Sequence, residues 1–160
     1  MRVTQDSSKR ILLVGATGYA GNQLASYLLE GTAATVILAG RNKAKLDELQ
    51  SGLRQQDSVD RTEVLVLDAA NLDSAALCDF DLLVNATNEG PHNGSLIQAC
   101  LDHQADWIDM QMTNELLHPP PVLGEKIESA GRSFVIQAGF HPGVIAPLVR
   151  YADQQMELME

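Results

Sequence analysis

The chain has 160 residues, with 11 Lys and Arg against 21 Asp and Glu, so its formal net charge at pH 7 is −10. This length fits one domain, and 45% hydrophobic with 20% charged residues indicates a globular chain and not a disordered one. The acidic balance argues against nucleic acid and anionic membranes as partners, because both need a basic surface, and no apolar run reaches the ~18 residues of a membrane span.

Six short apolar runs recur along the chain, and they do not alternate apolar with polar residues. Continuous apolar runs are typical of strands that are buried on both faces of a parallel sheet. The predicted strands are Ile11–Val14, Val36–Ala39, Val64–Leu67, Leu82–Val84, Trp107–Ile108 and Phe134–Ile136.

Four segments with helical periodicity lie between these runs. The first should face the sheet with Leu24, Tyr27 and Leu28, which recur at spacings of three and four. It should end at Gly31, a residue type common just after helices, and the second should begin at the capping residue Asn42. The predicted helices are Tyr19–Glu30, Asn42–Leu53, Asn93–His103 and Val122–Gly131.

This alternation of strands and helices predicts the fold class. Parallel strands need right-handed helical crossovers, so we expect an α/β fold with a doubly wound, mostly parallel six-stranded Rossmann-type sheet and helices on both faces. The folded domain should cover residues 10–151. A polar N-terminal arm, 1–9, which is not typical of a signal peptide, and an acidic C-terminal tail, 152–160, should flank it.

The strongest motif is the glycine-rich segment GATGYAG, directly after the first predicted strand. Three glycines at this spacing allow a tight turn, close approach of the backbone to a pyrophosphate, and close packing of helix on strand. The following helix N-terminus attracts phosphate. A plain strand-to-helix turn is the alternative, but the position in an alternating α/β chain favours a dinucleotide site. Its candidate residues are Gly15, Ala16, Thr17, Gly18, Tyr19 and Gly21.

The end of the second strand predicts which dinucleotide binds. NAD sites usually carry Asp or Glu there, about 20 residues beyond the glycines, whereas this chain has Arg41 followed by Asn42. A guanidinium can bind a 2′-phosphate through two hydrogen bonds, and Lys43 and Lys45 add positive charge nearby. The cofactor is therefore predicted to be NADP and not NAD. A solvated Arg41 beside a helix cap is the alternative.

Two further strand ends should contribute to the same cleft, because ligands bind outside the carboxyl ends of parallel strands. Asp68 could accept a hydrogen bond from the adenine amino group, or it could simply cap a helix near Asn71. Asn85, Ala86 and Thr87 follow the fourth strand, where the ribose and pyrophosphate should run.

The last two strand ends face the predicted nicotinamide end. Asp109 and His141 are the catalytic candidates there. The Tyr-x-x-x-Lys pair of short-chain reductases is absent from the sequence. Cys78 and Cys100 are expected to be small core residues and not nucleophiles. The histidines show no metal-ligand spacing, so no metal site is predicted.

Six motifs together resemble the NADP-binding domain of the saccharopine dehydrogenase family. They cover most of the chain, from about Ile11 to Tyr151. The motifs are Gly15–Gly21, Ala39–Arg41, Val84–Ala86, Ala99–Leu101, Trp107–Asp109 and Ala138–Gly143.

The resemblance implies hydride exchange between NAD(P) and a C–N bond of an amino-acid adduct. It implies pyrophosphate contacts at Gly15, Gly18 and Gly21, and a 2′-phosphate contact at Arg41. Asn85 and Ala86 would line the cofactor cleft, and Asp109 and the His141–Gly143 turn would face the reacting end. Family members carry a second α+β domain that holds the substrate, which these 160 residues do not include.

The sequence therefore leaves two functions open. The first is the cofactor domain of an NADP-dependent oxidoreductase, which acts on a small amino-acid-type substrate when a second domain is present. The alternative is a non-catalytic NADP-binding or redox-sensing module that acts through a partner protein. In either case we expect a cytoplasmic protein that pairs with a second copy through apolar surface left uncovered.

Overall fold

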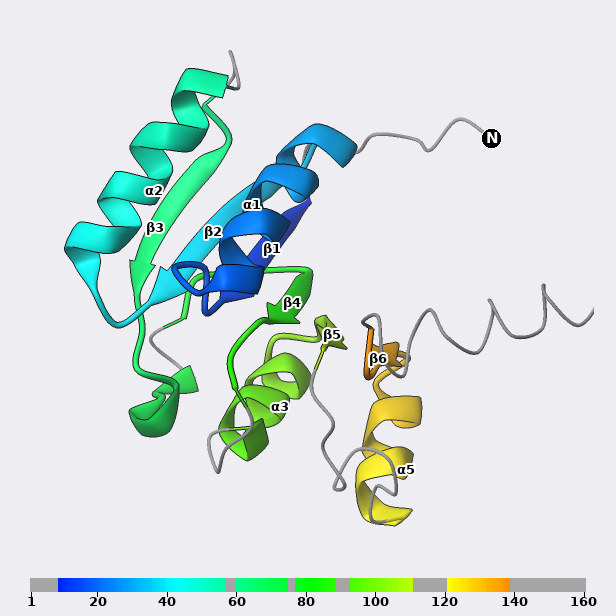
Figure 1. Cartoon of the computed structure of the whole chain (residues 1–160). Coiled ribbons are helices and arrows are strands. Elements are labelled where there is room, and N and C mark those ends of the chain that lie inside the picture. Colours follow the sequence, from blue (N-terminus) through cyan, green and yellow to red (C-terminus); the bar gives the residue numbers. More distant parts are fainter. Residues whose placement is uncertain (1–8, 57–59, 75–76, 89–92, 111–120, 139–160) are drawn as a thin grey trace, which may run out of the picture.

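The computed structural model describes residues 9–56, 60–74, 77–88, 93–110 and 121–138 (Figure 1). In this part of the chain six strands form one sheet in the order β3-β2-β1-β4-β5-β6, and every pair is parallel. The predicted doubly wound sheet is confirmed. Its strands are β1 Arg10–Val14, β2 Thr35–Gly40, β3 Thr62–Val66, β4 Leu82–Asn85, β5 Asp106–Asp109 and β6 Phe134–Val135.

The order of the strands reverses between β1 and β4, which lie side by side at the centre of the sheet. A reversal of this kind leaves a crevice at the carboxyl ends of the two strands, where ligands of such sheets bind. The helices are α1 Tyr19–Gly31, α2 Lys43–Gln56, the short 3₁₀ helix η1 Ala69–Asn71, α3 Asn93–Asp102 and α5 Pro121–Ser129.

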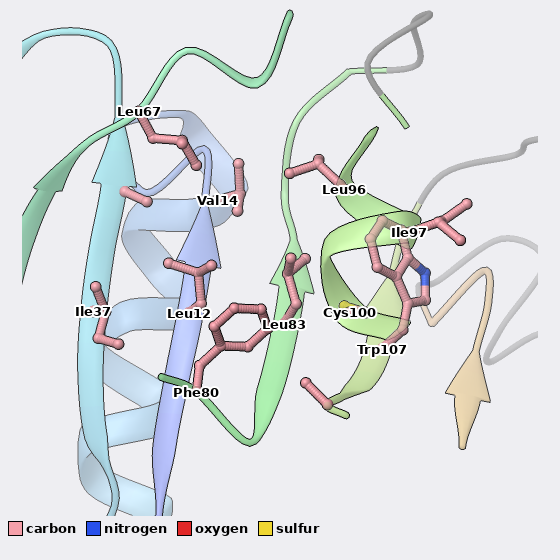
Figure 2. Close-up of a cluster of buried hydrophobic side chains, with 12 residues drawn as sticks. Leu12, Val14, Ile37, Leu67, Phe80, Leu83, Leu96, Ile97, Cys100 and Trp107 are labelled. Atoms are coloured by element: carbon pink, nitrogen blue, oxygen red, sulfur yellow. The ribbon is translucent and has the colours of Figure 1, made fainter. Parts of the chain in front are cut away.

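Helices cover both faces of the sheet. Alternate residues of each central strand point to opposite sides, and both sets are apolar, so each face needs a covering layer. In β1, Leu12 and Val14 belong to one buried cluster with Leu96 and Cys100 of α3 (Figure 2). Ile11 and Leu13 belong to the second cluster, together with residues of α1 and α2. Each fully buried Leu or Ile contributes about 1.5–3 kcal/mol, so a strand that is apolar at every position stabilises both layers.

The face of α1 that meets the sheet differs from the predicted one. Its buried residues are Gly21, Ala25 and Leu29, while Leu24 and Leu28 are only partly buried at the edge of the cluster. Tyr27 is wrongly predicted to face the sheet, because it is 64% exposed. Small residues at the contact let the helix backbone approach the strands, and the larger side chains are displaced to the flanks.

The end of α1 also differs from prediction. Gly31 is the last helical residue and not a left-handed residue beyond the helix. Thr32 ends the helix instead, since its backbone N–H and its Oγ1 both donate to the carbonyl of Leu28, at 3.1 and 2.7 Å. Arg61 donates to the carbonyls of Leu29 and Thr32, at 2.8 and 2.6 Å. These donors satisfy carbonyls that a helix end leaves without partners.

Replacing Arg61 by lysine should lower the free energy of unfolding by about 1–3 kcal/mol, because one ammonium cannot reproduce the fork that meets two carbonyls. Urea unfolding monitored by circular dichroism measures the change. The matched control is Arg54→Lys, whose exposed ion pair with Asp60 should contribute only about 0–1 kcal/mol. Equal decreases of the free energy of unfolding in the two variants would contradict this role of Arg61.

Candidate functional site: a crevice at the carboxyl edge of the sheet

A crevice of about 400 Å³ lies where the β1–α1 turn meets the ends of β2, β3 and β4. It brings together seven of the residues that the sequence predicts for the cofactor site: Gly15, Thr17, Gly18, Arg41, Asp68, Ala86 and Thr87. Their convergence from four separate strand ends agrees with the rule that ligands bind at the switch point of the sheet.

The glycines of the β1–α1 turn are required by its geometry. Gly15 has φ +84°, and a Cβ there would lie 2.9 Å from the backbone of Ala86. A Cβ on Gly21 would lie 2.2 Å from the carbonyl oxygen of Gly15. The turn is held against β2, because the N–H groups of Gly15 and Ala16 both donate to the carbonyl of Ala39, at 3.0 and 3.1 Å. The turn therefore needs glycine at both positions before any ligand is considered.

The start of α1 fits a phosphate group. Gly18 precedes the helix, and no side chain caps it. The hydrogen bond from the Asn22 N–H to the Gly18 carbonyl, 2.9 Å, begins the helical ladder, so the preceding first-turn N–H groups lack helical acceptors. Gly18 also lines the crevice, and with no Cβ it leaves space over these donors. An anion there would be stabilised by the N–H groups and by the helix dipole.

Positive charge at the rim of the crevice comes from Arg41. Its exposed side chain makes no ion pair or hydrogen bond with another residue that the structure describes. The prediction that both lysines reinforce it needs correction, because Lys43 is paired with Asp47 at 2.7 Å. Lys45 lines a neighbouring groove between α1 and α2 that shares Thr17 with the crevice. The guanidinium of Arg41 is therefore the cation available at this edge of the described crevice.

Asp68 holds the backbone on the β3 side of the crevice. Its carboxylate accepts hydrogen bonds from the Ala70 N–H at 3.2 Å and from the side-chain amide of Asn71 at 2.7 Å, and so caps η1. The predicted cap near Asn71 is thus present. Asp68 also lines the crevice, and a contact from it to adenine stays a prediction.

Asn85 and Asn42 lie beside the crevice and do not line it. Asn85 is fully buried, accepts hydrogen bonds from the N–H and the hydroxyl of Thr87 at 3.1 and 2.7 Å, and donates to Asn93 at 3.2 Å. Asn42 accepts from the Lys45 N–H at 3.1 Å, which confirms its predicted role as the cap of α2. Both amides therefore shape the backbone, and a direct cofactor contact from either stays a prediction.

Three other candidates of the glycine segment also lie off the crevice lining. Ala16 and Gly21 are buried, whereas Tyr19 is 91% exposed at the start of α1. Asp109 is fully buried at the end of β5. His141 lies outside the described residues.

Six further lining residues are outside the set of predicted site residues, and each lies within two residues of a predicted one along the chain. Their positions at strand ends are the signal that could have found them. They are Val14, Gly40, Leu67, Ala69, Ala70 and Asn88.

The cysteine of α3 is a core residue, as predicted. Cys100 is fully buried, and its thiol faces the carbonyl of Asp106 at 3.8 Å. Burial raises the pKa of the Cys100 thiol above its ordinary value, with the charge of Asp106 as the second cause. A neutral thiol of this kind is a poor nucleophile. Cys78 is partly buried against the same cluster.

This raised pKa predicts a pH dependence of stability. The folded thiol stays neutral, whereas the unfolded thiol loses its proton above its ordinary pKa of about 8.5. The stabilising contribution is therefore complete below about pH 8.5 and is lost as the pH rises, by at most about 1.4 kcal/mol per pH unit. Urea unfolding at several alkaline pH values measures the slope. Cys100→Ala should remove it and Cys78→Ala should keep it, and identical slopes in the two variants would contradict the assignment.

His103 packs at the edge of the core. Its ring stacks on Phe80 with centroids 5.0 Å apart, and Nε2 lies 3.0 Å from the carbonyl oxygen of Ser74.

Within the described ranges, no group of three or more His, Cys, Asp or Glu side chains is arranged to hold a metal ion. Nor does that part of the chain contain a helix long and apolar enough to cross a bilayer.

Comparisons with known proteins agree with this geometry. The family model described as the saccharopine dehydrogenase NADP binding domain matches residues 11–134. A curated relative, the shikimate dehydrogenase (NADP(+)) of Methylobacillus flagellatus, is 34% identical over 90 residues, which make up 56% of this chain and 30% of the relative.

Two solved structures share the fold. Apo saccharopine dehydrogenase (L-Glu forming) from Saccharomyces cerevisiae gives a TM-score of 0.69 at 19% identity, covering 92% of this chain and 31% of that one. The second is an NADPH-bound short-chain oxidoreductase from Pseudomonas aeruginosa PAO1 that contains an atypical catalytic center. It gives a TM-score of 0.59 at 16% identity, covering 82% of this chain and 72% of that one. The chain spans less than a third of the length of the shikimate and saccharopine dehydrogenases.

Proposed function

The chain belongs to the family of saccharopine dehydrogenase NADP-binding domains, and from this premise we propose that its crevice binds NADP(H) for an oxidoreductase reaction at a C–N bond of an amino-acid-type substrate. The observation that carries the proposal is the convergence of the α1 N-terminus and the available guanidinium of Arg41 on one crevice. These are the two groups needed for a pyrophosphate and for a 2′-phosphate.

Each part of the proposed site has a separate task. Gly15 and Gly18 let the pyrophosphate approach the first-turn N–H groups of α1. Arg41 binds the 2′-phosphate, and Thr87 with Ala86 limits the crevice on the side of β4. When bound, NADP(H) supplies or accepts the hydride, and the protein contributes position and electrostatics.

The substrate groups are proposed to come from another part of the protein. Arg41 and Asp68 are the only ionisable residues among those described as lining the crevice, and both are assigned to the cofactor. The alternative is a non-catalytic NADP-binding or redox-sensing module acting through a partner, and the same lining supports it. NADPH oxidation by the complete natural protein, assayed with keto acids plus amino acids, separates the two: turnover supports the enzyme, and tight binding without turnover supports the module.

The test of the proposed cofactor is a titration with NADPH, followed by nicotinamide fluorescence, with NADH as the control. We expect saturable binding of NADPH and binding of NADH that is at least about tenfold weaker, equivalent to about 1.4 kcal/mol. No binding of either nucleotide would contradict the proposed function, and equal binding would contradict the role of Arg41.

Pairing with a second copy of the chain and a cytoplasmic location stay predictions. The exposed tyrosines of α1, Tyr19 and Tyr27, which are 91% and 64% accessible, support a contact through that helix. Sedimentation equilibrium of the protein with and without NADPH tests the pairing.

A further inference from the structure

The exit of β6 is held by the last residue of the neighbouring strand. Asp109 ends β5 and is fully buried. Its Oδ2 accepts a hydrogen bond from the indole Nε1 of Trp107 at 2.7 Å, and its Oδ1 accepts one from the backbone N–H of Gln137 at 3.1 Å. Its backbone carbonyl accepts the N–H of Ala138 at 2.7 Å. One residue thus binds two consecutive N–H groups just beyond β6.

These contacts matter because β6 itself is short. It has two residues, and it pairs with β5 only through Trp107–Phe134 and Ile108–Val135. The rings of Trp107 and Phe134 stack with centroids 6.0 Å apart. A buried indole N–H needs an acceptor, since burial without one is costly. Asp109 supplies that acceptor and fixes the stacked ring and the strand exit together.

The backbone at the exit is also in an uncommon conformation. Gln137 has φ +57°, in the left-handed region that residues other than glycine rarely adopt. Such a conformation persists only where surrounding contacts enforce it. The hydrogen bonds from the N–H groups of Gln137 and Ala138 to Asp109 are the contacts that do so here.

We propose that Asp109 is a positioning residue that fixes the direction in which the chain leaves β6, and thereby shapes the nicotinamide end of the cofactor crevice. The proposal rests on the proposed function. In a sheet of this order the adenine side of the crevice lies toward β3 and the nicotinamide side toward β5 and β6. Both carboxylate oxygens already accept N–H donors in a fully buried site. Asp109 therefore acts on the backbone and not as a proton relay to substrate.

The test is Asp109→Asn in the complete chain, which keeps the shape of the side chain and replaces one acceptor oxygen by an NH₂ group. The matched control is Asp106→Asn at the other end of β5, where Oδ1 accepts the N–H of Ser133 at 2.8 Å. Both variants lose a carboxylate that holds the β6 segment, but only Asp109 lies at the crevice edge of the sheet. General destabilisation of the β5–β6 pairing would lower the stability of both variants, more in Asp109→Asn because Asp109 is fully buried.

Two measurements distinguish positioning from general destabilisation. In the ligand-free protein, amide hydrogen exchange at Gln137 and Ala138 should be at least about tenfold faster in Asp109→Asn and unchanged in Asp106→Asn. The Kd for NADPH should rise by about five- to tenfold in Asp109→Asn. The Kd for 2′-phospho-ADP-ribose, which lacks the nicotinamide, should change by less than about twofold.

A second variant keeps the proposal testable if Asp109→Asn folds poorly. Adding Gln137→Gly removes the penalty of the left-handed conformation, so the double variant should recover part of the NADPH affinity. Two results in Asp109→Asn would overturn the positioning role: unchanged amide exchange at Gln137 and Ala138, or an equal rise of the Kd values for NADPH and 2′-phospho-ADP-ribose. If the wild type binds neither ligand, the proposed function fails, whereas the exchange measurement still confirms or refutes the hold of Asp109 on the exit of β6.

Discussion

Replacing Arg41 by alanine should weaken NADPH binding by about 10- to 100-fold, because a charge-assisted, two-pronged contact with phosphate contributes about 1.5–3 kcal/mol. NADH carries no 2′-phosphate, so its Kd should change by less than about threefold. The side chain is exposed and makes no hydrogen bond or ion pair with other described residues, so the fold should be unaffected. Paired fluorescence titrations with the two nucleotides, at one fixed salt concentration, measure both effects.

The matched control for Arg41 is Lys43→Ala. It removes the same charge two residues away, but from an ammonium that is paired with Asp47 in an i,i+4 contact. We expect less than about a threefold change in the Kd for NADPH, because this charge is already compensated. If the lysine variant loses as much affinity as the arginine variant, general electrostatic attraction and not a specific phosphate contact accounts for the preference.

Gly21→Ala should be among the most damaging single-methyl substitutions in the chain. The added Cβ would lie 2.2 Å from the Gly15 carbonyl oxygen and 2.8 Å from its carbon, both of which are backbone atoms. The helix must then move away from the turn. Overpacking of this kind costs about 1–3 kcal/mol or more, and displacement of the α1 N-terminus should also abolish NADPH binding. Thermal unfolding and an NADPH titration measure the two consequences.

Gly31→Ala is the internal control in the same helix. A Cβ at Gly31 would meet no atom within 4 Å, and alanine favours a helix over glycine by about 0.5–1 kcal/mol. This substitution should be neutral or stabilising and should leave NADPH binding unchanged. Equal behaviour of the two alanine variants would show that the close contact at Gly21 does not govern the turn.

The sheet could be predicted from the sequence because its central strands β1 and β2 are buried on both faces. A strand such as Ile11–Val14 must be apolar at every position to serve two cores, and that pattern is visible without any structure. The cap at Asn42 and the glycine turn could also be predicted, because each depends on residues that are close in the chain.

The face and the end of α1 could not be predicted in the same way. Tyr27 has the right spacing for a core position, yet the close approach of the helix to the sheet selects Gly21, Ala25 and Leu29. The helix ends at Thr32 with the help of Arg61, which comes from a distant segment. Neither result depends on local propensity, since both arise from packing between elements.

The sequence by itself determined the fold class, the dinucleotide turn and the cation at the end of β2, because these depend on periodicity and on short-range spacing. Only the tertiary structure decided which polar side chains are available at the crevice. Arg41 and Lys43 are two residues apart, yet one is available and the other is paired. Asp109 lies at the carboxyl end of a strand as Asp68 does, yet it is buried between Trp107 and the exit of β6. Hydrogen-bond partners come from segments far apart in the chain, so the availability of a polar group is a property of the assembled fold.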